Sequence, residues 1–139
     1  MFLLDTHVWV WHAEGDTAKL GRSTVRLLER SATQDELRVS PLSLFEVSWL
    51  HATGRLHLSR GLERWIADAL ELASVRLAPL SGEAAVEAGS AGVVQVPDPV
   101  DRLIIATARD MGATLVTRDR RIRDYAVASM AVRVHDASR

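Results

Sequence analysis

Short apolar segments alternate with segments of helical character along almost the whole sequence, and this alternation restricts the fold more than any other feature. The apolar segments have the length and composition of strands, and they lie at residues 2–4, 36–40, 75–80, 113–117 and 131–135. Because predicted helices separate consecutive strands, the pattern favours a parallel sheet that helices cover on both faces. The sequence therefore predicts the α/β fold class.

The intervening segments carry helix start signals. Asp5-Thr6 is a good capping pair for a helix over the segment THVWVWHA, although the strict alternation of that segment also suits a strand. Ser40-Pro41 starts a helix that extends to about residue 54, with Ser as the cap and Pro in the first turn. Further helices are predicted over residues 20–31, 62–72, 81–89, 99–111 and 120–125.

Length and composition indicate one compact domain over residues 1–139, because 47% of the residues are apolar and a core is available. The net charge of −1 gives no overall attraction to nucleic acid or to a membrane. The absence of cysteine excludes disulfides, thiolate metal sites and thiol nucleophiles, and it fits a cytoplasmic protein. No segment approaches the roughly 18 apolar residues of a membrane span, and the N-terminal apolar run is too short for a signal peptide.

Acidic residues fall where parallel strands end or where the following helices begin. Asp5 comes directly after the first strand, and Asp119 follows the strand 113–117 by two residues. Glu46 lies in the second turn of the helix after the second strand, and Asp101 lies in the first turn of the helix 99–111. Functional groups of such folds gather beyond the carboxyl ends of the strands, so we expect these acids to meet.

A cluster of these carboxylates would be strongly unfavourable by itself. Two carboxylates about 4 Å apart repel by roughly 4 kcal/mol at an effective dielectric constant near 20. Such a cluster must take up protons or bind a cation. With oxygen ligands only, no cysteine and no histidine at a useful spacing, the site suits Mg²⁺ or Mn²⁺ better than Zn²⁺.

Each acid also has a purely structural interpretation. Asp5 and Asp119 are each placed to cap the helix that follows, and Asp101 is placed to complement a helix dipole in the first turn. Glu46 forms a capping-box pattern with Ser43, although a helix start three residues earlier places Glu46 inside the helix. From spacing alone, the structural interpretations and the metal site remain open alternatives.

Three segments resemble the PIN-domain family and, within it, the VapC-type toxins of bacterial toxin–antitoxin pairs. They are LLDTHVWVW, SPLSLFEVSWL and DPVDRLIIATARDMGATLVTRDRRIRDY, and together they place the likeness along nearly the whole chain. The resemblance implies a three-layer α/β/α sandwich whose parallel sheet has the strand order 3-2-1-4-5. It also implies a metal-dependent endoribonuclease that cleaves single-stranded or looped RNA with Mg²⁺ or Mn²⁺.

The resemblance also assigns roles to particular residues. It places the acidic quartet, as catalytic residues and metal ligands, on Asp5, Glu46, Asp101 and Asp119. It places a hydroxyl near the metal on Thr6 or Thr117. It further implies a small antitoxin partner, which often places a basic side chain in the acidic site, and a homodimer. Residues 54–95 match in pattern only, and partner and substrate specificity would lie there.

Basic side chains near Asp119 offer contacts to RNA phosphates. They are Arg118, Arg120, Arg121 and Arg123. The alternative is a solvated helix face balanced by Asp124. Arg102 would either pair with an acid of the cluster or reach the substrate.

Two other features have open interpretations. The tryptophans could stack on bases, although Trp49, which Phe45 accompanies at helical spacing, is expected in the core or in an interface. Asp98, which precedes Pro99, is expected to be a structural helix cap. The serious functional alternative is a PIN-like module that binds RNA or protein without cleaving it, and titration with Mn²⁺ would separate the two.

Overall fold

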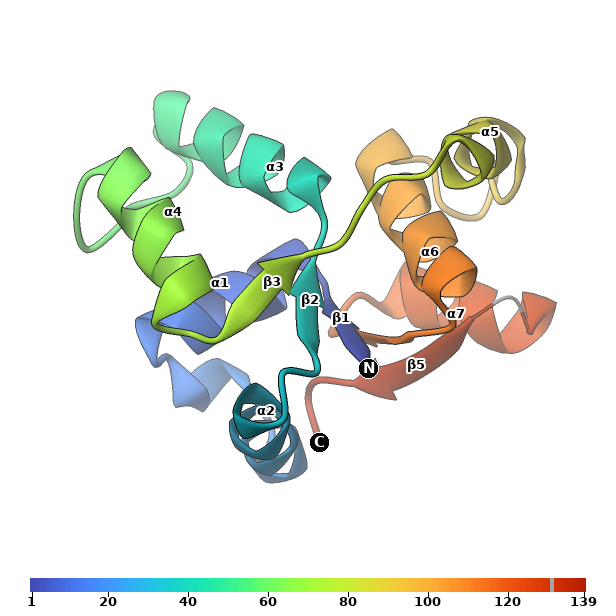
Figure 1. The fold of residues 1–139 in the computed structure, drawn as a ribbon. Helices are drawn as coiled ribbons and strands as arrows, with labels where there is room; N and C mark the ends of the chain where they lie inside the picture. The colour runs from blue at the N-terminus through green and yellow to red at the C-terminus, as the bar shows by residue number, and fades with distance from the viewer. Residues whose placement is uncertain (131) are drawn as a thin grey trace.

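A central parallel sheet organises the molecule (Figure 1). The computed structural model describes residues 1–130 and 132–139. The strands pair in the order β3-β2-β1-β4-β5 and all neighbours run parallel, as the resemblance implied. Their bounds are β1 Phe2–Leu4, β2 Leu37–Val39, β3 Val75–Leu77, β4 Thr114–Thr117 and β5 Arg133–Asp136.

Helices cover both faces of this sheet. Their bounds are α1 Thr6–Glu14, α2 Arg22–Thr33, α3 Pro41–Ala52, α4 Leu62–Glu71, α5 Gly82–Ser90, α6 Pro99–Met111 and α7 Arg120–Ser129, with a short 3₁₀ helix at Thr17–Lys19. Buried residues of α1, α2, α3 and α4 form one core, and those of α6 and α7 form another on the opposite face. The expected three-layer α/β/α arrangement is therefore confirmed, with α5 packed against α6 (Figure 1).

The central strand shows why the first residues are uniformly apolar. Successive side chains of a strand point to opposite faces, so Leu4 enters the core beneath α1 while Leu3 enters the core beneath α6. Both side chains are fully buried. Because both faces of β1 are covered, the strand cannot tolerate the alternation of polar and apolar residues typical of a half-exposed strand. Asp5 follows at the edge where helices leave the sheet.

Several element bounds differ from the sequence-based expectations. β3 ends at Leu77, because the chain turns away after Ala78, whose backbone N–H still donates to the carbonyl of Val39 at 2.8 Å. α7 continues to Ser129 instead of ending near residue 125. β5 spans Arg133–Asp136, and residue 131, at which that strand was expected to begin, lies outside the described residues.

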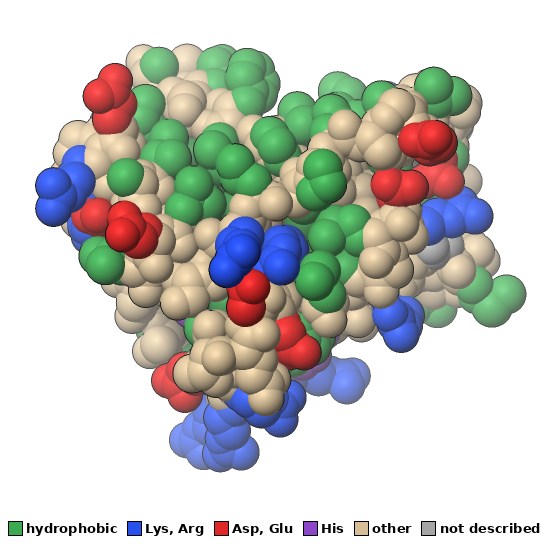
Figure 2. All heavy atoms as spheres, viewed as in Figure 1, with side chains coloured by type: hydrophobic (Ala, Val, Ile, Leu, Met, Phe, Trp, Pro, Cys, Tyr) green, Lys and Arg blue, Asp and Glu red, His purple; other side chains and the backbone are tan. Residues whose placement is uncertain are grey.

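The apolar residues of α3 do not all point inward. Phe45 and Trp49 are 61% and 49% exposed, so their expected place in the core is wrong. Figure 2 shows hydrophobic side chains gathered over α3 on this face of the molecule. Their place in an interface stays a prediction. Trp9 and Trp65, in contrast, are fully buried.

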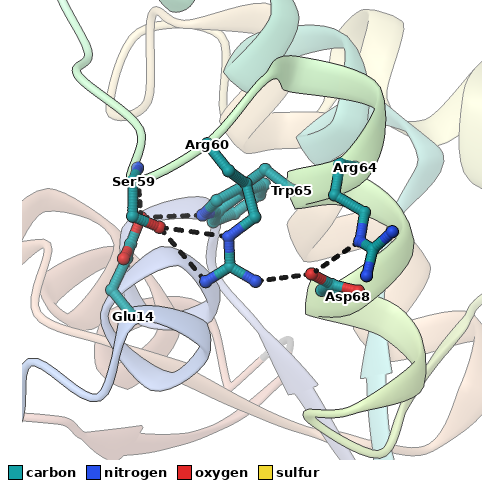
Figure 3. A network of polar contacts seen from close by, with 6 residues as sticks. All are labelled: Glu14, Ser59, Arg60, Arg64, Trp65 and Asp68. Carbon is teal, nitrogen blue, oxygen red and sulfur yellow. Dashed lines mark hydrogen bonds and ion pairs between the residues drawn. The ribbon is translucent and has the colours of Figure 1, made fainter.

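A polar network fastens α4 to the end of α1 (Figure 3). The indole N–H of Trp65 donates to Glu14 Oε1 at 2.7 Å, and the backbone N–H and hydroxyl of Ser59 donate to the same oxygen at 3.3 Å. The Trp65 ring meets Trp9 edge to face with centroids 5.2 Å apart. Asp68 on α4 accepts from Arg60 and Arg64 beside this contact. The network positions α1, which carries residues of the candidate site.

We expect Glu14→Ala to lower the free energy of unfolding by about 1–3 kcal/mol, because the buried indole N–H of Trp65 loses its acceptor. Urea denaturation followed by circular dichroism measures this change, with the exposed Glu71→Ala on α4 as control. In a Trp65→Phe background the donor is absent, so the effect of Glu14→Ala should shrink. Equal destabilisation in both backgrounds would contradict the role assigned to this hydrogen bond.

In the part of the chain that the structure describes, no helix is both long enough and apolar enough to cross a bilayer.

Candidate active site

A cavity of about 390 Å³ opens at the edge of the sheet where the strands have their carboxyl ends. Its lining residues are Asp5, His7, Val8, Trp11, Glu46, Asp98, Asp101, Arg118 and Asp119. The four acids expected to meet therefore line one cavity, although they come from distant parts of the chain. Asp5 lies between β1 and α1, Glu46 lies on α3, Asp101 lies on α6, and Asp119 directly precedes α7.

Hydrogen bonds hold Asp5 in one orientation at the base of this cavity. Its Oδ1 accepts from the backbone N–H of Thr6 at 2.8 Å, and its Oδ2 accepts from the hydroxyl of Thr117 at 2.6 Å. The Thr117 hydroxyl in turn accepts from the backbone N–H of Asp119 at 2.9 Å. Thr117 thus links two acids of the cavity, and Asp5 is both the cap of α1 and a lining residue.

Two further acids combine a helix cap with a place in the cavity. Asp119 Oδ1 accepts from the backbone N–H of Arg121 at 2.8 Å and of Ile122 at 3.2 Å at the start of α7. Asp98 Oδ1 accepts from the backbone N–H of Val100 at 2.9 Å, which confirms its expected role as a cap. Capping and a functional role are therefore compatible at these positions, since a carboxylate has two oxygens.

Asp98 was not expected in the functional site. It lines the cavity together with Asp101, three residues later on the same helix. The signal was present in the sequence, because a cap and a first-turn acid of one helix lie at the same end of it. His7 and Trp11, one turn apart on α1, also line the cavity. Trp11 was among the tryptophans considered for stacking on bases, whereas no role in the site was expected of His7, whose signal was its position two residues after Asp5.

α1 and α3 are joined behind the cavity. The hydroxyl of Thr6 donates to the hydroxyl of Ser43 at 2.8 Å, and both residues are buried. The N-cap of α3 is Ser40, whose hydroxyl accepts from the backbone N–H of Leu42 at 3.1 Å. The capping-box interpretation of Glu46 is therefore wrong, and Glu46 lies inside α3 with its side chain on the cavity.

The acids of the cavity disfavour one another's ionised forms. Burial raises the pKa of Asp101 to about 8, and the charges of Asp5, Asp98, Asp119 and Glu46 add to the rise. Burial also raises the pKa of Asp5, against the opposing hydrogen bond from Thr117. The pKa of Glu46 is raised by burial and by Asp5, against the opposing effect of Thr6. The cavity therefore favours the uptake of protons or of a cation.

The donor set fits a hard divalent cation. All the acidic donors are carboxylate oxygens, which Mg²⁺ and Mn²⁺ prefer in proteins. Within residues 1–130 and 132–139, no group of three acidic or imidazole side chains stands at the spacing that holds a metal ion. The carboxylates that line the cavity would therefore have to turn toward an ion to bind it.

Arg102 pairs with backbone carbonyls and not with an acid of the cluster, which was one of its two expected roles. Arg102 donates from Nε to the carbonyl of Ala88 at 2.8 Å, and from Nη1 to the carbonyls of Val96 at 3.0 Å and Pro97 at 2.8 Å. It therefore fastens the connection between α5 and α6, and neither an acid of the cluster nor the cavity engages it. The geometry gives no support to substrate contact by Arg102.

Arg120 also lies outside the cavity lining. Its side chain is 85% exposed and pairs with Asp124 at 3.7 Å, as the solvated-face alternative required. Arg123 pairs with Asp136 at 2.6 Å. Of the arginines that flank Asp119, Arg118 is the one that lines the cavity.

A larger cavity of about 530 Å³ lies at the opposite edge of the sheet, between the ends of α6 and α7 and the start of β5. Its described lining is apolar or small apart from Arg109 and Arg133. Since this cavity contains no group suited to acid–base or metal chemistry, the smaller acidic cavity is the candidate site.

Comparisons with known proteins agree with this geometry. The PIN domain family matches residues 2–128. Ribonuclease VapC22 of Mycobacterium tuberculosis (strain ATCC 25618 / H37Rv) is 34% identical over 123 residues, which cover 88% of this chain and 90% of that protein. The crystal structure of VapBC2 from Rickettsia felis bound to a DNA fragment from their promoter has a chain with a TM-score of 0.69 and 17% identity, with 97% of both chains covered. At this level of sequence identity, the structural similarity shows that the two chains share a fold.

Proposed function

Because this chain belongs to the PIN-domain family, we propose that it is a Mg²⁺- or Mn²⁺-dependent endoribonuclease and the toxin of a toxin–antitoxin pair. The observation that carries the proposal is the convergence of Asp5, Glu46, Asp101 and Asp119 on one cavity. The relative from M. tuberculosis is named a ribonuclease, and the similarity spans most of both chains. Similarity to a protein named a ribonuclease and the acidic cavity both support the proposal.

Asp5, Glu46, Asp101 and Asp119 would hold one or two divalent ions. A bound ion lowers the pKa of water and stabilises the negative charge that develops at a phosphodiester during hydrolysis. The protein orients these ligands. The Thr117 hydroxyl donates to Asp5 and accepts from the backbone N–H of Asp119, so it holds the two residues in fixed positions relative to each other. The proposal needs no covalent intermediate with the protein, because water is the attacking group. The chain also has no cysteine that could act as a nucleophile.

Purified protein tests this proposal directly. We expect cleavage of a single-stranded RNA at internal positions when Mg²⁺ or Mn²⁺ is present, and no cleavage in excess EDTA. Internal cleavage is recognised with an RNA labelled at both ends, because neither end is released as a mononucleotide. Mn²⁺-dependent thermal stabilisation without cleavage would favour the binding module instead, and the absence of both would contradict the proposal.

We also propose that a small antitoxin inserts a basic side chain into the acidic cavity. The support is electrostatic, because a guanidinium would favour the ionised form of Asp101, whose pKa burial and the neighbouring carboxylates raise. Such a side chain and a divalent ion would compete for the same carboxylates. Calorimetric titration with an arginine-containing antitoxin peptide should therefore give weaker binding as Mn²⁺ is added, and binding independent of Mn²⁺ would exclude this arrangement.

A homodimer is the remaining part of the proposal. Sedimentation velocity over a range of concentrations should give a species of twice the monomer mass of 15.3 kDa. A monomer at all concentrations would refute it.

A further inference from the structure

An aromatic ring and positive side chains lie together on one side of the acidic cavity. Trp11 and Arg118 line the cavity, and the guanidinium carbon of Arg118 is 5.6 Å from the centroid of the Trp11 ring. The Lys19 ammonium is 5.8 Å from the same centroid. The His7 ring, which also lines the cavity, is 5.9 Å from the Trp11 ring and tilted by 47°.

This group is held in place by the fold. Trp11 is half-buried and packs against the core beneath α1. Arg118 Nη1 donates to the backbone carbonyl of Lys19 at 3.0 Å, which fastens two positions far apart in the chain. Arg118 is nonetheless exposed, and Lys19, whose side chain is 55% exposed, pairs with Asp16 at the surface at 3.3 Å, so that phosphate can compete with this carboxylate for the ammonium. We refer to Trp11, His7, Arg118 and Lys19 as the rim group.

Positive charge beside the acidic cavity would favour the approach of an RNA strand. Five acids line the cavity, and the net charge of the chain is −1, so the approach of a polyanion is unfavourable without local cations. Of the arginines first expected to contact RNA, Arg102 binds backbone carbonyls and Arg120 pairs with Asp124, whereas Arg118 lines the cavity. Arg118 and Lys19, which lie over the Trp11 ring, supply positive charge beside the acids, and the ring has the size and apolar surface that stack with a base.

We propose that the rim group is the binding site for the nucleotide next to the cleaved phosphate, with an unpaired base stacked on Trp11 beside His7 and the adjoining phosphates on Arg118 and Lys19. The proposal rests on the proposed endoribonuclease function. It adds a location and a substrate class, because only an unpaired base can stack on a side chain. A single strand therefore enters the site over α1.

A matched pair elsewhere on the surface provides the control. Arg55 lies 5.4 Å from the ring centroid of Trp49, so this pair has the same chemistry as Trp11 with Arg118. Trp49 is exposed on α3 and is not part of the cavity lining. If a tryptophan under an arginine were enough to bind RNA, both pairs would contribute equally.

The test measures the binding of a fluorescein-labelled single-stranded RNA of ten nucleotides by anisotropy in EDTA, where no cleavage occurs. Trp11→Ala should raise Kd about tenfold or more, and Trp11→Phe should recover most of the affinity because phenylalanine still stacks. Trp49→Ala and Arg55→Ala should leave Kd unchanged when sedimentation shows the same oligomeric state. Arg118→Ala and Lys19→Ala should each reduce the slope of log Kd against log salt by about 0.7.

Further measurements separate this inference from the proposed function. With Mn²⁺, Trp11→Ala should raise KM for single-stranded RNA with little change in kcat, and it should keep the thermal stabilisation by Mn²⁺. If the unaltered protein cleaves RNA while Trp11→Ala binds and cleaves equally well, the rim group is refuted and the nuclease stands. If Trp49→Ala weakens binding as much as Trp11→Ala, the location is also refuted. If the unaltered protein neither binds nor cleaves RNA, both proposals fail.

Discussion

Replacing Asp101 by Asn should reduce RNA cleavage by more than about 100-fold without unfolding the protein. Asp101 lies in the first turn of α6, and its pKa is raised to about 8 because burial and four neighbouring carboxylates oppose its charge. Removal of a group that only hydrogen-bonds to a metal ligand reduces metal affinity or activity about 10- to 100-fold. Loss of a ligand itself should therefore exceed that range. Asn keeps the size of the side chain and α6 keeps its Asp98 cap.

A second aspartate on α6 serves as the control. Asp110 is exposed near the other end of the helix and is not part of the lining of the acidic cavity. Asp110→Asn should therefore cleave RNA at the rate of the unaltered protein. Single-turnover cleavage of an end-labelled RNA in Mg²⁺ compares the three proteins, and circular dichroism checks their fold. If Asp101→Asn cleaved RNA as fast as Asp110→Asn, the assignment of Asp101 to a catalytic acidic quartet would be wrong.

The same substitution should change stability in opposite directions with and without metal. In EDTA at pH 8 we expect Asp101→Asn to be more stable than the unaltered protein by about 1–3 kcal/mol, since it removes one of the mutually repelling acids. With Mn²⁺ at about 1,000 times Kd, binding should stabilise the unaltered protein by about 4.1 kcal/mol, which exceeds the advantage of the variant in EDTA. The variant should gain much less. The order of their melting temperatures should therefore reverse.

The pH dependence follows from the direction of the pKa shift. The pKa of Asp101 is raised from 3.8 to about 8 in the folded state, so the folded protein binds more protons than the unfolded chain between these values. The metal-free protein should lose stability as the pH rises from about 4 to about 8. Burial raises the pKa values of Asp5 and Glu46 as well, which adds to the same trend. Asp101→Asn should show a shallower decline.

Differential scanning fluorimetry from pH 5 to pH 8, in EDTA and in Mn²⁺, tests both expectations. Asp110→Asn should show no reversal between the two conditions, because it lies outside the acidic cavity. If Asp101→Asn were less stable than the unaltered protein in EDTA at pH 8, the burial of the Asp101 charge and its repulsion by neighbouring acids would not dominate at this position. If Mn²⁺ stabilised it as much as the unaltered protein, Asp101 would not be a metal ligand.

Much of the architecture was predictable because its causes are local. The alternation of apolar segments and capped helices predicted the parallel sheet, and Ser40-Pro41 marked the start of α3 correctly. The strand order followed from the family resemblance and is the order of the sheet. The core position of Trp49 was wrong because helical spacing defines an apolar face without saying what covers it.

For the site, the sequence by itself determined which acids lie at strand ends and helix starts, because Asp5 and Asp119 each accept a hydrogen bond from the backbone of a residue that closely follows. The hydrogen bond from Thr117 to Asp5 depends on the tertiary structure. Only the tertiary structure decided which cations accompany them. Arg102 donates to carbonyls of α5 and of the segment between α5 and α6. Arg118 donates to the carbonyl of Lys19, and this hydrogen bond holds its guanidinium over Trp11. Such long side chains point toward whichever acceptors the folded chain supplies, and no local pattern contains that information.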